Sequence, residues 1–236
     1  MFKKTLMTLS ALALLLTPIA LQAQGPSMAV NDFRNDVTGV YWWAGGVGRD
    51  LAGMLTNELA STGAFQMVER QKLDAVLDEQ DLGASGRVSP QTAAKIGKMV
   101  GAKYLVTGTV TAFEESGSQG GGIGYRGVRL GGKKKETYMA VDFRVVDTTS
   151  GVVAFTRTVE ARAKSKGVSV GVYKGGFAGN LAKEKNTPAG KAIRAMVIEA
   201  SDFFECAMVT KGSCMGEFDA KEKKRRDSAK DTISLD

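Results

Sequence analysis

The sequence predicts an α/β (α+β) domain in which a mixed sheet is flanked by helices, extended by two long β-hairpins. Strand-like runs alternate with amphipathic helical runs along most of the chain, which is typical of a layered α/β fold. Two glycine-rich windows lie between long segments of alternating apolar and polar residues, which indicates the hairpins. With 236 residues, of which 43% are hydrophobic, the chain is long enough to bury one ordinary core.

Residues 1–23 predict a secretory signal peptide. Lys3 and Lys4 precede an apolar run over residues 6–16, and Ala23 closes a small-residue cleavage site. The apolar run is well short of the roughly 20 residues that a membrane-spanning helix needs. We therefore expect an exported protein of the periplasm or outer membrane, whose domain covers residues 24–210. Because no cysteine lies near the cleavage site, we also expect that it is not lipid-anchored.

The first half of the domain reads as strand, helix, strand. Residues 28–33 predict a short strand, and a glycine-rich segment follows it. The next helix carries an apolar stripe at helical spacing and ends at Gly63. The stripe consists of Leu51, Met54, Leu55 and Leu59. A second strand is expected over residues 65–69.

The chain then predicts two further helices, a strong strand and a long last helix. An amphipathic helix is expected over residues 71–80, and Ser89-Pro90 is a typical helix start, so a third helix is expected from there to residue 100. A strand follows over 103–113. Thr187-Pro188 begins the last helix, whose apolar face continues for more than five turns and should pack on the core. That face consists of Ala189, Ala192, Ile193, Met196, Val197, Ala200, Phe203, Phe204 and Ala207.

The glycine distribution locates the two hairpins, over about residues 111–146 and 152–185. Windows 117–132 and 167–179 hold eight and five of the 29 glycines. The flanking strands alternate with period two, as strands between two different media do. Such strands could form part of an oligomeric β-barrel, with one face on lipid. Periodicity alone favours the alternative of two long soluble hairpins. The candidate barrel-facing residues are Met139, Val141, Phe143, Val159, Ala161, Ala163, Val168, Val170 and Val172.

The composition excludes most catalytic sites. The chain has no histidine, so neither a Ser-His-Asp unit nor a histidine-containing zinc site can form. The sequence G-x-G-x-x-G over residues 122–127 is followed by strand residues and not by the helix that a dinucleotide site requires. We therefore predict no enzyme activity, no catalytic or metal site and no cofactor. The net charge of +7 does not indicate a nucleic-acid partner, because an exported protein meets little nucleic acid.

The C-terminal part contains both cysteines and a charged tail. Cys206 and Cys214 are eight residues apart, which is too far for a bond along one continuous helix. Lys211-Gly212-Ser213 should interrupt the helix and allow a disulfide. Residues 211–236 are rich in both signs of charge and poor in apolar residues, so they predict a disordered tail.

Both tryptophans are adjacent, in the glycine-flanked loop Tyr41-Trp42-Trp43. Aromatic side chains in such a loop either anchor it on the core or form a rigid rim at a binding surface or pore. Without further information the core-anchoring interpretation is favoured.

Several segments together resemble the CsgG family, the curli production assembly/transport component. The resemblance covers about residues 28–208. The segments that carry it are Ala29-Val30-Asn31-Asp32-Phe33, the helix start at Gly48-Arg49-Asp50-Leu51, residues 65–73, Gly101-Ala102-Lys103-Tyr104-Leu105-Val106-Thr107-Gly108, residues 145–151 and Thr187-Pro188-Ala189-Gly190-Lys191-Ala192-Ile193-Arg194.

The resemblance implies a subunit of an oligomeric outer-membrane secretion channel for curli-type or other unfolded exported proteins. Family members have a periplasmic domain, and each gives two hairpins to a barrel shared by a ring of about nine subunits. Export occurs without ATP, and a loop after the first strand narrows the channel, which makes Tyr41, Trp42 and Trp43 candidate constriction residues. The implied partners are further copies of the chain, the exported polypeptide and the outer membrane. The glycine-rich, lysine-containing hairpins favour the alternative, a soluble periplasmic scaffold or binding protein such as a regulator of envelope assembly.

Overall fold

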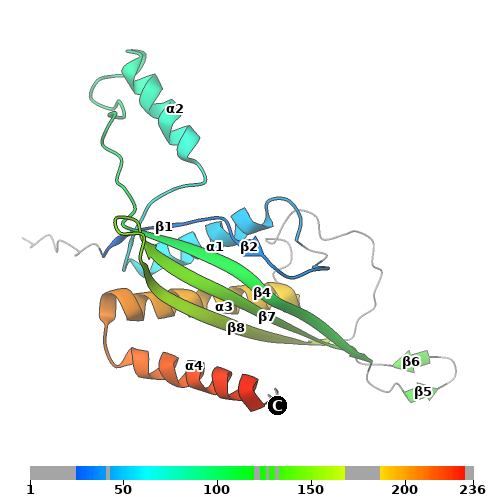
Figure 1. Cartoon of the computed structure of the whole chain (residues 1–236). Coiled ribbons are helices and arrows are strands. Elements are labelled where there is room, and N and C mark those ends of the chain that lie inside the picture. The colour runs from blue at the N-terminus through cyan, green and yellow to red at the C-terminus, as the bar shows by residue number, and fades with distance from the viewer. Residues whose placement is uncertain are drawn as a thin grey trace, which may run out of the picture.

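The computed structural model describes residues 25–40, 43–119, 123–125, 128–130, 133–167 and 187–231. It has two layers, a sheet and a group of helices that pack against it (Figure 1). Among the described strands the order is β3-β1-β4-β7-β8, with the short β2 paired to β4, and this part of the sheet is open, with β3 and β8 at its two ends. Parallel and antiparallel pairs both occur, so the prediction of an α+β fold with a mixed sheet flanked by helices is confirmed.

The N-terminal half forms the parallel part of the sheet. Strand β1 (Ser27–Val30) pairs in parallel with β3 (Gln66–Met67) and with β4 (Tyr104–Gln119), and β2 (Arg34–Asn35) also pairs with β4. Helix α1 (Val47–Thr62) buries Leu51, Leu55 and Leu59 against these strands, as the apolar stripe predicts. It ends at Gly63, whose φ of 68° is the left-handed conformation that glycine adopts readily.

Helix α2 (Leu73–Ala84) is present where the sequence predicts it, but the helix expected from Ser89 to residue 100 is absent from the structure. Separate turns form there, and in the first of them the Ser89 carbonyl accepts from the amides of Thr92 and Ala93. The following residues are exposed and Gly97 has a φ of 75°. A short helix needs tertiary packing for its stability, and this segment packs on no core in the structure.

The antiparallel part consists of three long strands. Strand β4 pairs with β7 (Lys133–Asp147), and β7 pairs with β8 (Val153–Gly167). The small strands β5 (Ile123–Tyr125) and β6 (Val128–Leu130) pair with each other beyond the ends of β4 and β7 (Figure 1).

The turn between β7 and β8 is held by Asp147, whose carboxylate accepts from the backbone amides of Thr149 and Ser150. The Ser150 amide hydrogen bond is the main cause that lowers the pKa of Asp147. The pairing of β4 with β7 agrees with the expectation for residues 111–146. The partner expected for β8 within residues 152–185 lies in 168–186, outside the described residues.

Helix α3 (Pro188–Glu205) continues into a π-helical turn (Cys206–Thr210) and supplies most of the helical side of the core. Thr187 caps the helix, because its hydroxyl accepts from the Gly190 amide, and Pro188 follows as predicted. Every residue of the predicted apolar face is buried, so that interpretation is confirmed.

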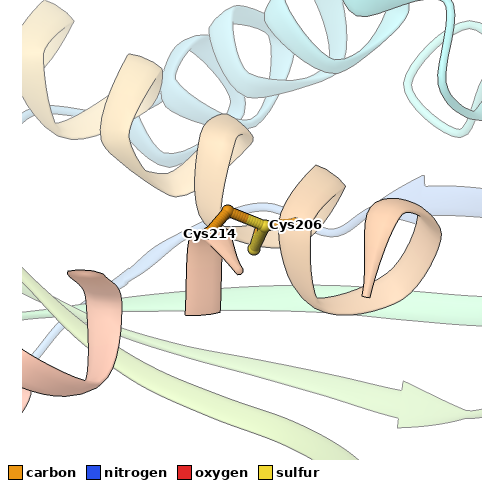
Figure 2. Close-up of a disulfide and its surroundings, with 2 residues drawn as sticks. All are labelled: Cys206 and Cys214. Atoms are coloured by element: carbon orange, nitrogen blue, oxygen red, sulfur yellow. A yellow bond between two sulfur atoms is a disulfide. The ribbon is translucent and has the colours of Figure 1, made fainter. Parts of the chain in front are cut away.

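The C-terminal segment is a helix and not the disordered tail that the sequence predicts. Helix α4 (Cys214–Asp231) begins at the disulfide between Cys206 and Cys214, whose Cα atoms are 6.0 Å apart (Figure 2). The Arg157 guanidinium lies 5.1 Å from the ring centre of Phe203 and 5.7 Å from that of Phe218, and it donates to the Phe218 carbonyl. The amino-acid composition did not predict this helix, because Phe218 is its one buried residue and charge pairs such as Lys221–Glu217 dominate its surface.

Candidate functional site

The sequence marks two segments for function, and the structure brings them to the same part of the domain. The first is the loop between β2 and α1. The second is the outer part of the long strands, comprising Glu114–Gln119, Lys133–Tyr138 and Arg162–Gly167, which we call the strand arm. Its three strands are in register, from the row Glu114–Tyr138–Arg162 to the row Gln119–Lys133–Gly167. At about 3.4 Å per residue the strand arm is about 17 Å long.

The loop leaves the sheet close to the base of the strand arm. Asn35 is paired with Val110, and the Asp36 amide donates to the Val110 carbonyl over 3.0 Å. The register of β4 shifts between Val110 and Ala112, immediately past this contact. The Asn35 side chain also bonds to both the amide and the carbonyl of Val37, which makes the first turn of the loop rigid.

Two glycines hold Phe33 beneath this loop. The Phe33 amide donates to the Gly48 carbonyl over 3.0 Å, and a Cβ on Gly48 would lie 2.2 Å from the Phe33 oxygen. A Cβ on Gly108 would lie 2.7 Å from the Phe33 ring. Both positions therefore require glycine, and together they fix the start of α1 relative to β4.

The aromatic triplet is only partly placed. Tyr41 and Trp42 lie outside the described residues. Trp43 is partly buried and packs against the core together with Val37 and Val40, and its amide donates to the Val40 carbonyl over 3.1 Å. For Trp43 this arrangement agrees with the core-anchoring interpretation of the loop.

The structure corrects the lipid-facing interpretation of the alternating strand residues. All six candidates in β7 and β8 are buried in the core: Met139, Val141, Phe143, Val159, Ala161 and Ala163. The reason is that α3 packs on this face of the sheet, so the apolar side of the alternation faces a helix. Val168, Val170 and Val172 lie outside the described residues.

The opposite face of the same strands is polar and carries a network that the sequence analysis missed. The Arg162 guanidinium lies 4.7 Å from the Tyr138 ring centre, and the Tyr138 hydroxyl bonds to Glu160. Farther out, Lys164 and Glu136 form an ion pair at 3.5 Å. The period-two pattern already puts these residues on one face, but only the register of β7 and β8 shows which side chains meet.

Burial of the Tyr138 phenol, followed by its hydrogen bond to Glu160, raises the pKa of Tyr138 to about 12, from an ordinary value of about 10. A group whose pKa is higher in the folded state adds stability that is complete below the unfolded pKa and is lost as pH rises through the folded one. We expect Tyr138→Phe to remove this loss. Between pH 9 and 12 the denaturation midpoint should fall less with rising pH in the variant than in the wild type. An identical pH dependence of the midpoint in the two proteins would contradict the placement of Tyr138.

The described residues contain no group of three or more His, Cys, Asp or Glu side chains suited to a metal ion. One open hollow of about 490 Å³ lies beside Asp32, Arg49, Arg70 and Asp74. Its charges are mixed, and Arg49 faces Asp32 at 3.9 Å with both side chains largely exposed. This arrangement is an exposed ion pair, which contributes little to stability.

The family of the chain follows from its sequence as a whole. The family model of the curli production assembly/transport component CsgG matches residues 14–233, which is most of the chain. The chain belongs to the CsgG family. The match includes the loop, the strand arm and α4. Among curated proteins, none matches this chain.

Several solved structures are similar to this chain at low sequence identity. This CsgG-family chain is similar to the hypothetical protein CT253 of Chlamydia trachomatis, with 11% identity, a TM-score of 0.45, and 79% of this chain and 99% of that one covered. It is similar to protein XCC0632 of Xanthomonas campestris, with 12% identity, a TM-score of 0.37, and coverage of 87% and 93%. It is also similar to PelC of Paraburkholderia phytofirmans, crystallised as a dodecamer, with 12% identity, a TM-score of 0.35, and coverage of 75% and 82%. At these values none of these proteins' properties is transferred to this chain.

Among the described helices, none combines the length and the apolar character needed to cross a bilayer.

Proposed function

We propose that this protein is a subunit of a CsgG-like oligomeric secretion channel of the outer membrane, which exports curli-type or other unfolded polypeptides without ATP. The observation that carries the proposal is the strand arm, in a chain whose family is named for curli assembly and transport. Three in-register strands continue for about 17 Å from the row of Tyr138 to the row of Lys133. Passive export requires no acid, base or nucleophile, so the protein works as a conduit and not as an enzyme.

The arrangement of the strand arm supports this proposal in two ways. First, the strand arm and the loop that holds Trp43 are attached at neighbouring points of β4, so a ring of subunits would place a loop beside each set of strands. Second, the strand arm presents polar side chains on one side, including Glu136, Lys164 and Arg162, which suits a face toward water. The signal peptide delivers the chain to the periplasm, from which the ring inserts.

The test is the location and size of the native protein. Outer membranes are isolated from expressing cells, extracted in a mild detergent, and the particle is sized and imaged. We expect the protein in the outer-membrane fraction, as a ring several times the mass of one subunit. A protein that is wholly soluble and monomeric would contradict the proposal.

A shortened strand arm provides the matched variant. Ser116 is paired with Glu136, so residues 117–135 can be replaced by Asn-Gly, which makes a two-residue hairpin turn. This variant should retain the folded domain, shown by an unchanged denaturation midpoint, but lose membrane insertion. If it still inserts as a ring, the strand arm is not the channel-forming element.

The second candidate function is a soluble periplasmic scaffold, and the burial of the candidate barrel residues favours it. Met139, Val141 and Ala161 are packed in the core, so this conformation does not offer them to lipid. A scaffold would use the folded domain as it stands. In the same experiment it would remain in the periplasmic fraction, and the shortened variant would behave like the wild type.

A further inference from the structure

The net charge of the chain is concentrated at the end of the strand arm. Residues 117–135 and 165–167, which we call the basic tip, contain six basic residues and no Asp or Glu. The basic residues are Arg126, Arg129, Lys133, Lys134, Lys135 and Lys166. The whole chain has a net charge of +7, so all other residues together carry +1, the difference between +7 and +6. The basic tip is therefore a local positive charge on an almost neutral protein.

The strand register brings four of these charges together. In the three outermost rows of the strand arm, β7 contributes Lys133–Lys135, and Lys166 of β8 is paired directly with Lys134. The Cα atoms of the four lysines lie within about 7 Å of one another, from the spacings along and between strands. Like charges opposite each other on a sheet are destabilising. Farther in, the row of Lys164 and Glu136 holds opposite charges, which form an ion pair at 3.5 Å. An anionic partner would relieve the repulsion in the outer rows.

Beyond these rows lies the small hairpin β5–β6, which has one wholly apolar face (Figure 1). Ile123 is paired with Leu130, and Tyr125 with Val128. Paired residues share a face, and so do residues two apart along a strand, so all four belong to one face. Arg129 belongs to the opposite face. The sequence thus joins an apolar surface directly to a group of lysines.

The hairpin β5–β6 also needs a surface to cover it. Among the described strands, β5 and β6 pair only with each other. A two-stranded hairpin is marginally stable in water, and packing of its apolar face is what stabilises it. A partner that covers this face would therefore order the hairpin as it binds.

Size and composition together indicate what kind of partner this is. Each strand of the hairpin has three residues, far too few for the roughly 800 Å² that each partner contributes to a stable protein–protein interface. A bilayer surface accepts so small an apolar face. Aliphatic and tyrosine side chains enter the boundary between headgroups and acyl chains, while neighbouring basic side chains contact anionic headgroups. Tyr125 among aliphatic residues, followed by Lys133–Lys135, is this combination.

We propose that the basic tip attaches the protein to an anionic lipid surface. The apolar face of β5–β6 enters the boundary between headgroups and acyl chains, and Lys133–Lys135 and Lys166 bind the lipid phosphates. A single subunit can make this contact, so the inference goes beyond the proposed function and does not depend on a ring. In a channel the attachment brings each subunit to the membrane before assembly, and in a scaffold it holds the domain at the membrane.

Vesicle flotation tests the attachment. The purified wild-type protein is mixed with vesicles of phosphatidylcholine, with and without phosphatidylglycerol. We expect flotation only with the vesicles that contain phosphatidylglycerol. The affinity should fall as salt is raised, because charges at a surface are screened over about 10 Å at ordinary ionic strength. Equal flotation with both kinds of vesicle, or with neither, would overturn the proposal.

A charge variant locates the contact. Replacing Lys133–Lys135 by three glutamines should weaken binding to the anionic vesicles about 100-fold, since each basic residue near such a surface contributes about fivefold. The matched control is Lys223→Gln, Lys224→Gln, Arg226→Gln, which removes the same charge from exposed positions of α4 and should bind like the wild type. An unchanged denaturation midpoint shows that each variant is folded. Equal losses in the two variants would assign binding to overall charge and overturn the proposal.

A fluorescent label tests the insertion of the hairpin. The natural cysteines are bonded to each other, so Leu130→Cys supplies one free thiol for a polarity-sensitive dye. The dye emission should shift to the blue on binding to the anionic vesicles. Ser116→Cys is the matched control, because it lies three residues inward from the end of β4 and should stay in water. If the protein floats but the dye at position 130 stays in water, the proposed insertion is wrong.

The outcomes separate this inference from the proposed function. If the protein binds anionic vesicles but forms no ring in outer-membrane extracts, the attachment stands and the channel proposal fails. If a ring forms and the glutamine variant of Lys133–Lys135 floats and assembles like the wild type, the attachment fails and the channel proposal stands. Binding to polyglutamate that is as tight as binding to the vesicles, without a dye shift on the vesicles, would assign the basic tip to an acidic polypeptide and overturn the lipid assignment.

Discussion

Replacement of Phe143 by alanine is expected to destabilise the protein by about 3–5 kcal/mol, the range for deleting a buried phenylalanine ring. Phe143 is 1% exposed and lies at the centre of the core. Its ring meets Phe33 edge-on at 5.6 Å between centres and Phe204 at 5.7 Å, so one side chain joins the β1–α1 connection, the sheet and α3. Its loss leaves a cavity that all three elements line.

The measurement is chemical denaturation, with the change read from the midpoint at constant slope. Arg144→Ala is the matched control, because Arg144 is the next residue on β7, faces the other side of the sheet and is exposed. The control should change stability by no more than about 0.5 kcal/mol. Equal effects of the two variants would show that β7 is not oriented as described.

Removal of the disulfide is expected to cost about 2–3 kcal/mol, as for a loop of this length. The bond joins Cys206 at the end of α3 to Cys214 at the start of α4 (Figure 2). The double variant Cys206→Ala, Cys214→Ala leaves α4 held chiefly by Phe218 and by the contact of Arg157 with the Phe218 carbonyl. We therefore expect α4 to open locally before the domain unfolds.

Limited proteolysis reports on this opening, because α4 is rich in Lys and Arg. Trypsin should remove α4 from the double variant well before it cleaves the body, and reduction of the wild type with a thiol should reproduce the effect. The single variant Arg157→Ala, which keeps the disulfide, serves as a comparison for the non-covalent contact. A double variant as resistant as the wild type would show that the disulfide contributes little to holding α4.

The reliable sequence signals were those contained within one helix, such as its caps and its apolar face. The cap at Thr187-Pro188 and the apolar face from Ala189 to Ala207 define α3, and all of that face is buried. Gly63 ends α1 because the left-handed cap is a local property of the backbone. Signals that depend on packing against another segment failed. Ser89-Pro90 is a typical helix start, but the residues after it pack on no core and form no helix.

In the candidate site, too, the local pattern predicted some properties and failed for those that depend on distant segments. Period-two alternation correctly separates the two faces of β7, but it does not state what covers each face, and α3 covers the one that contains Val141. The contact of Arg157 with Phe203 and Phe218 joins positions 46 and 61 residues apart along the chain, so no local pattern could reveal it or the helix it stabilises.

The sequence by itself determined the family, the mixed α+β class and the places where strands and helices alternate, since periodicity, caps and turn residues are short-range properties. Only the tertiary structure decided the environment of each surface. It buried the alternating strand residues, ordered α4 through Cys206–Cys214, and left the apolar side chains Val76 and Leu77 of α2 exposed. These outcomes depend on which distant segments pack together, and burial energy arises only from such contacts.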